Sequence, residues 1–148
     1  MDRDDILDRI LYGYFLEQLF SVATGRLDKL LSVVSIILGS SVIGGFIPEI
    51  SGVLIVVIAT VQTIYGFGQK SGNAMRKSAE YLQLFDDAGK YSDSELKTQL
   101  RILEKTDEHI WSSLKDIAIL KTQIKVGLPS EQQVKLSVKS KSMRFLCG

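Results

Sequence analysis

The feature that most constrains this chain is a forty-residue stretch that carries almost no charge. Residues 30–69 contain one charged side chain, Glu49, whereas the other 34 charged residues lie in the remaining 108 positions. One water-soluble core rarely needs such a separation, because charged side chains normally recur along a soluble chain. The stretch therefore predicts a region that meets a different solvent from the rest of the protein.

The stretch divides at Pro48 and Glu49 into two apolar segments, 30–47 and 50–67. As helices, segments of this length cover roughly 27 Å, close to the thickness of a bilayer's hydrocarbon core of about 30 Å. We therefore expect a transmembrane hairpin with a very short turn. Two alternatives are a soluble bundle with these helices at its centre and, given the β-branched residues of 53–58, buried strands.

Basic residues flank the hairpin on both sides: Arg26 and Lys29 before it, and Lys70, Arg76 and Lys77 after it. The turn offers only the acidic Glu49. Because cytoplasmic flanks carry an excess of Lys and Arg, we expect both termini in the cytoplasm and a multi-pass location in the cell (inner) membrane.

Small residues recur within the first segment at spacings of about four, namely Ser35, Gly39, Ser40, Gly44 and Gly45. Such stripes allow helix backbones to approach closely in lipid. The stripe is explained either by packing against the second segment or by self-association of several copies. In the latter case Ser35 and Ser40, with Thr60, Gln62 and Thr63, are candidates to line a polar path.

The flanking regions are expected to be helical, so the fold class predicted is an all-α membrane protein. Residues 1–29 form an N-terminal amphipathic helix, with Leu7, Ile10 and Leu11 on one face and acidic residues at its start. Residues 70–129 form a cytoplasmic helical hairpin. Its first helix continues the second membrane segment and ends near residues 86–89.

Ser92 and Glu95 have the spacing of a capping box and predict the start of the next helix. From there apolar residues recur in steps of three and four, close to a coiled-coil register over about four heptads. Asp107 and Lys121 occupy two positions of this seam that should be apolar. The seam needs a partner, which is residues 71–88, the N-terminal helix or another copy. The seam residues are Leu96, Leu100, Leu103, Ile110, Leu114, Ile117 and Ile124.

The last region, residues 130–148, is a basic tail. From residue 115 onward the chain has seven basic and two acidic side chains. A basic segment beside a bilayer is attracted to anionic headgroups. The tail is therefore either lipid-facing, through Lys135, Lys139, Lys141 and Arg144, or a solvated disordered segment.

The sequence offers little for an enzyme. His109 and Cys147 are the single histidine and cysteine and lack the spacing of zinc ligands, and nucleotide-binding glycine motifs are absent. We therefore expect no catalytic residues, no metal and no cofactor. A net charge of +1 and basic residues without aromatic interleaving also exclude a nucleic-acid platform.

The layout from about Ile6 to Pro129 resembles the SLATT proteins, small bacterial membrane modules associated with nucleotide-sensing and phage-defence systems. The similar stretch includes the post-membrane segment 77–85 (KSAEYLQLF) and the long helix that ends near Leu128 and Pro129. The resemblance implies a membrane effector, such as a pore former, that harms the host cell when a linked sensor triggers it. This chain contains no sensor domain, and the family supplies no catalytic residues.

Together these features predict a bacterial or phage-encoded protein that oligomerises and permeabilises the inner membrane as a defence effector. One alternative is a non-toxic anchored scaffold, whose cytoplasmic helices recruit a protein partner or sensor. A second alternative is a holin-like lysis protein, since small holins also have two spans and a basic tail. A holin, however, does not need the long seam helix.

Overall fold

The computed structural model describes residues 2–45, 48–106 and 110–147, without the side chains of 48, 49 and 146. All the regular secondary structure in these ranges is α-helix or 3₁₀ turn, with no strand. The all-α prediction is therefore confirmed. The helices are α1 (Arg3–Ile43), α2 (Pro48–Tyr65), α3 (Phe67–Asp86), α4 (Asp93–Lys105), α5 (Ser112–Lys125) and α6 (Val138–Cys147), with short 3₁₀ turns at Ala88–Lys90 and Ser130–Gln132.

Helix α1 is a single rod of 41 residues. The expected boundary between an N-terminal helix ending at residue 29 and a separate membrane helix is therefore wrong. Nothing in the sequence between Arg26 and Leu30 stops a helix, because no proline occurs there and Arg, Leu and Lys are good helix formers. Asp2 caps the start of the rod through a capping box with Asp5.

The turn after α1 depends on two glycines that precede Pro48. Helix α1 ends at Ile43, Gly44 caps it, and Gly45 has a φ of +68°, a conformation that favours glycine. Pro48 is the first residue of α2, a position where its missing N–H costs nothing. Residues 46–47, the end of the first predicted segment, lie outside the described residues.

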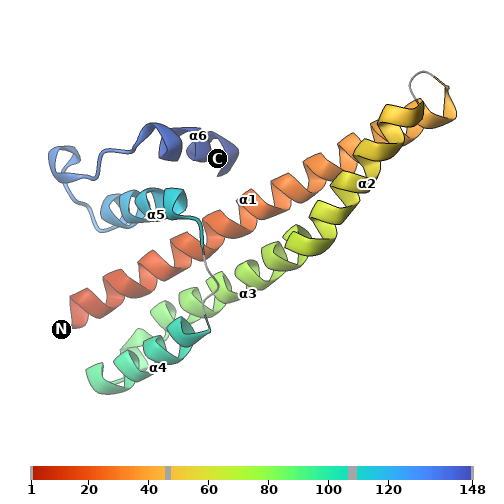
Figure 1. Cartoon of the computed structure of the whole chain (residues 1–148). Helices are drawn as coiled ribbons and strands as arrows, with labels where there is room; N and C mark the ends of the chain where they lie inside the picture. Colours follow the sequence, from red (N-terminus) through yellow and green to blue (C-terminus); the bar gives the residue numbers. More distant parts are fainter. Residues whose placement is uncertain (1, 46–47, 107–109, 148) are drawn as a thin grey trace.

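Helices α2 and α3 follow one another across Gly66. The Gly66 N–H donates to the Gln62 carbonyl at 2.9 Å, and the Lys70 N–H donates to the Gly66 carbonyl at 2.9 Å. Gly66 has a φ of +56°, a conformation that favours glycine, and the helical direction changes there. Figure 1 shows α2 and α3 running back along α1 as the second arm of a long hairpin.

Apolar side chains form two cores at the end of the hairpin that is remote from the turn. The first joins α1, α3 and α4 around Tyr81. The second joins α1, α5 and α6 around Leu114 and contains a T-shaped pair between Phe20 and Trp111, whose ring centroids are 5.5 Å apart. Helix α4 therefore lies beside α3, while α5 and α6 cover the other side of α1 (Figure 1).

The expected continuous seam helix is wrong. Helix α4 ends at Lys105, Ile110 and Trp111 are not helical, and α5 begins at Ser112. Leu96 and Leu100 are buried in the first core, with Leu103 partly buried against it, whereas Ile110, Leu114 and Ile117 are buried in the second. Ile124 is 55% exposed and belongs to neither.

The break follows from the two cores, because a straight helix cannot bury its two halves on opposite sides of α1. The polar seam residue Asp107 lies between the halves in the sequence, so a continuous helix gains no burial there. Asp107 and His109 themselves lie outside the described residues. Helix α5 ends as predicted, with Gly127 at a φ of +83°.

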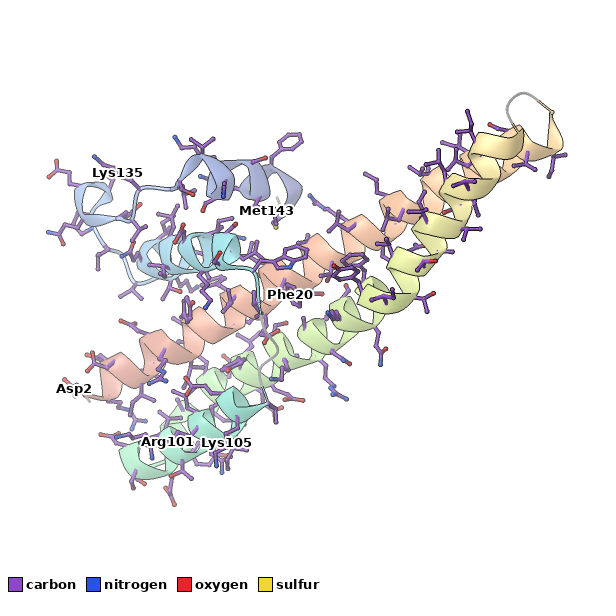
Figure 2. The ribbon with its side chains drawn as sticks, viewed as in Figure 1. Asp2, Phe20, Arg101, Lys105, Lys135 and Met143 are labelled. Carbon is purple, nitrogen blue, oxygen red and sulfur yellow. The ribbon has the colours of Figure 1, made fainter. Side chains whose placement is uncertain are left out.

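The tail is not a solvated disordered segment, and that alternative is wrong. Residues 138–147 form α6, which places Ser140 and Cys147 in the interior. The Ser140 hydroxyl donates to Asp116 Oδ2 at 2.8 Å, and the Cys147 thiol donates to the Leu19 carbonyl at an Sγ–O distance of 3.7 Å. Figure 2 shows Met143 on α6 and Phe20 on α1, and both belong to the second core. The basic residues Lys135, Lys139, Lys141 and Arg144 are all exposed.

Candidate functional site: an exposed apolar hairpin

The half of the hairpin nearest the turn is covered with exposed apolar side chains. Among its described residues from 30 to 65, one is buried, Ser51. Twelve large aliphatic residues there are 37% to 90% exposed: Leu30, Val33, Ile36, Ile37, Val42, Ile43, Ile50, Val53, Leu54, Val56, Val57 and Ile64. Contiguous apolar surface of this extent is rare on water-soluble monomers. The described helices do not form the soluble bundle in which 30–47 and 50–67 fill the centre.

The two-span hairpin expected from the sequence is not confirmed: among the residues that the structure describes, one helical stretch, Ile50–Asp86, is long and apolar enough to cross a membrane. It combines α2 with α3, and its most apolar window has a mean hydropathy of 2.0 with 6% of its residues buried. The low burial distinguishes this stretch from the core helix of a soluble protein.

Four hydroxyl groups of the exposed hairpin are satisfied within their own helices. Each donates to the backbone carbonyl four residues earlier, at 2.8 to 3.1 Å: Ser40 to Ile36, Ser41 to Ile37, Thr60 to Val56 and Thr63 to Ala59. Such bonds leave the hydroxyls without need of water. The surface therefore meets the requirement that lipid imposes on polar groups.

The small residues of α1 do not bring its backbone against α2. A Cβ atom built at Gly39 or Gly45 has no neighbouring atom within 4 Å. Gly44 and Gly45 serve the turn instead, as the cap and the residue after it. Ser35 is half-buried and Ser40 is exposed. Packing between the two arms therefore does not explain Gly39, and its surface is open to a further contact.

Gln62 is separated from the other two candidates for a polar path. Its Nε2 donates to Ser32 Oγ at 3.2 Å and to the Asp28 carbonyl at 3.4 Å, which joins α2 to α1. Thr60 and Thr63 are exposed. Asp28 and Ser32 were not predicted from the sequence as partners of Gln62. The spacing along the hairpin could have indicated this pairing, since residue 62 follows the turn by about as many positions as residues 30–32 precede it.

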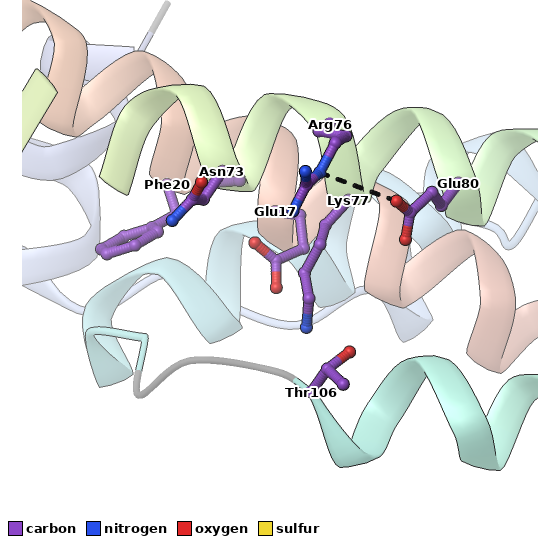
Figure 3. Close-up of a pocket in the computed structure, with 8 residues that line it drawn as sticks. Glu17, Phe20, Asn73, Arg76, Lys77, Glu80 and Thr106 are labelled. Carbon is purple, nitrogen blue, oxygen red and sulfur yellow. Dashed lines mark ion pairs between the residues drawn. The ribbon is translucent and has the colours of Figure 1, made fainter. Parts of the chain in front are cut away.

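The base of the hairpin holds a polar pocket of about 330 Å³ between α1, α3 and the end of α4 (Figure 3). Glu17 on α1 is 2% exposed, and its carboxylate lies in the same space as the ammonium of Lys77 from α3 (Figure 3). Arg76 and Glu80 form an exposed ion pair at the rim, with 3.8 Å between Nε and Oε1.

Two titratable side chains, Tyr12 and Cys147, have raised pKa values where α5 and α6 pack against α1. Burial raises the pKa of the Tyr12 hydroxyl, and the nearby Asp116 carboxylate raises it further. Burial also raises the pKa of the Cys147 thiol, against the opposing effect of Arg26 and Lys121. The described residues contain no group of three or more His, Cys, Asp or Glu side chains that could hold a metal ion.

No protein family, curated protein or solved structure matches the chain.

Proposed function

We propose that this protein enters a bacterial membrane as a two-helix hairpin made from residues 30–65. The single observation that carries the proposal is the exposed apolar surface on both arms, in which four hydroxyl groups are bonded within their own helices. The 18 residues of α2 cover roughly 27 Å, slightly less than a hydrocarbon core of about 30 Å. Local thinning of the bilayer accommodates a mismatch of this size.

The charges of the hairpin assign its orientation within this proposal. Arg26 and Lys29 precede the first arm, and Lys70 with Arg76 follows the second. The positive-inside rule then places both termini and the two cores in the cytoplasm. The cores lie at the end of the hairpin remote from the turn, which agrees with this orientation (Figure 1).

We propose further that several copies associate through the small-residue face of α1 and permeabilise the membrane. Gly39 supports this step, because its surface is in the lipid-facing half of α1 and contacts nothing within 4 Å in the single chain. In lipid, close backbone approach at such a glycine is a main source of helix association. The resemblance to SLATT proteins agrees with an effector of this kind.

The alternative is a non-toxic anchor, whose cytoplasmic helices recruit a partner. One observation favours it, namely that Gln62 is engaged with α1 and that Thr60 and Thr63 bond their own helix. These three side chains then contribute fewer free polar groups to a path for ions or solutes.

Induced expression in bacteria with a membrane-potential dye separates the two. We expect wild-type protein to collapse the potential, and Gly39→Leu to slow the collapse about tenfold or more, because a leucine keeps backbones apart. Gly72→Leu is the matched control, since Gly72 lies on α3 outside residues 30–65 and a Cβ built there also meets open space. An undisturbed potential with membrane-inserted wild-type protein would leave the anchor as the function.

A further inference from the structure

Helix α6 has an outward face that the fold does not use. Its inner face consists of Ser140, Met143 and Cys147, which contact α1 and α5. At 100° per residue, Val138 and Phe145 lie on the opposite side, seven positions apart. They are 84% and 91% exposed, so neither contributes to a core.

Three cations surround these apolar side chains. Lys141 lies beside Phe145 on the helix circumference, and Lys139 and Arg144 flank the face on its two sides. All three are exposed. Apolar residues in the centre with Lys and Arg around them are typical of helices that bind the interface of an anionic bilayer.

The carboxyl end of α6 lies close to the level at which the proposed membrane begins. The Cys147 thiol contacts the Leu19 carbonyl, and Arg26 is near enough to act on that thiol electrostatically. Arg26 precedes Leu30, the first exposed apolar residue of the hairpin, by four residues or about 6 Å. A headgroup layer is about 5–7 Å deep on each side, so Arg26 falls within it.

The tilt of the hairpin completes this geometry. Transmembrane helices tilt by about 20° on average. A tilt towards α6 would bring its carboxyl end, with Arg144 and Phe145, nearer to the headgroups (Figure 1). The exposed Arg26 and Lys29 of α1 then extend the same positive surface around the hairpin.

We propose that the outward face of α6 binds the anionic phospholipid headgroups of the membrane that the hairpin enters. This inference rests on the proposed membrane hairpin and adds a second, lipid-selective contact to it. Lys139, Lys141 and Arg144 attract the headgroups, and Phe145 enters the interface. Helix α6 is thereby fixed against the bilayer, and the α5–α6 side of the base faces the lipid.

The experiment uses the full chain with Cys147→Ser and Ser142→Cys, which places one fluorophore on the outward face beside Val138 and leaves Phe145 in place. The labelled protein is reconstituted in vesicles that carry a nitroxide on some phosphatidylcholine headgroups. Quenching is compared between phosphatidylcholine alone and a mixture with about 30% phosphatidylglycerol. Alkaline flotation of the same vesicles reports insertion of the hairpin independently.

We expect strong quenching with phosphatidylglycerol and little without it. Charge reversal at Lys139, Lys141 and Arg144 (each to Glu) should weaken the docking equilibrium by more than about 100-fold, because the loss of each cation alone costs about fivefold and each added carboxylate is repelled. The matched control reverses Lys97, Arg101 and Lys105 on α4, which lies at the end of the molecule away from the turn (Figure 2). This control should quench like the parent protein.

Salt supplies a test without charge variants, in case the triple reversal fails to fold. Raising NaCl from 0.05 to 0.5 M should release the label, because screening shortens the reach of the cations. Inserted protein whose label is unquenched, or equally quenched with and without phosphatidylglycerol, would overturn the proposal. Protein that does not float with the vesicles would instead contradict the membrane hairpin itself.

Discussion

At the scale of single residues, Gly13 sets the distance between the two arms at their base. A Cβ atom at this position would lie 2.6 Å from Cε1 of Tyr81, whose ring is 1% exposed. The ring cannot move away without disturbing the first core, in which it contacts Ile10 and its neighbours. Gly13 is therefore required by packing between α1 and α3, although no sequence motif marks it.

Gly13→Ala should lower the free energy of unfolding by about 1–3 kcal/mol, the usual cost of overpacking. Gly72→Ala is the control, because a Cβ at Gly72 meets open space and alanine is the better helix former by up to ~1 kcal/mol. Thermal unfolding of both variants in the same detergent measures the contrast. Equal midpoints for the two would contradict the close contact with Tyr81.

Cys147 is a second residue with a specific consequence. Because burial raises the pKa of its thiol, the reactive thiolate is scarcer at pH 8 than for an accessible cysteine. Alkylation of the folded chain by iodoacetamide should therefore be at least tenfold slower than that of the denatured chain, and should accelerate as the pH rises. Equal rates at pH 8 would show that α6 does not cover the thiol.

At the scale of elements, the helices whose ends carry explicit signals were predictable from the sequence. Ser92 and Glu95 form the expected capping box, with the Ser92 N–H donating to Glu95 Oε2 at 2.9 Å. These hydrogen bonds also lower the pKa of the Glu95 carboxyl. Gly127 ends α5 as its sequence indicated.

The elements whose boundaries depend on tertiary contacts were not predictable in this way. The seam from Leu96 to Ile124 has one helical period, but its halves are buried in separate cores on two sides of α1. Likewise, α6 is stabilised by Ser140 and Cys147 against Asp116 and Leu19, which are distant in sequence. Local pattern carries no information about such partners.

Ser92→Ala should destabilise α4 by about 1 kcal/mol, whereas Ser92→Gly should cost only a few tenths. Hydrogen exchange of the α4 amides measures the effect, which should be confined to α4 and the α3 end that it covers. Equal exchange in wild type and Ser92→Ala would contradict a stabilising cap.

At the scale of the whole molecule, the charge partition of the sequence has a direct counterpart in the structure. The residues remote from the turn bury their apolar side chains in two cores, while those of 30–65 leave theirs exposed. The apolar arms were predictable from composition alone. The open surface at Gly39, the contact of Gln62 with Asp28 and Ser32, and the pocket at Glu17 required three-dimensional positions.

Alkaline carbonate extraction of membranes from expressing cells tests the central claim most directly. If 30–65 is embedded in lipid, the full chain remains in the membrane pellet at about pH 11, because its apolar surface loses stabilisation on leaving the bilayer. A peripheral or soluble control protein should be released under the same conditions. Recovery of this chain in the supernatant as a folded, monodisperse protein would contradict the membrane hairpin.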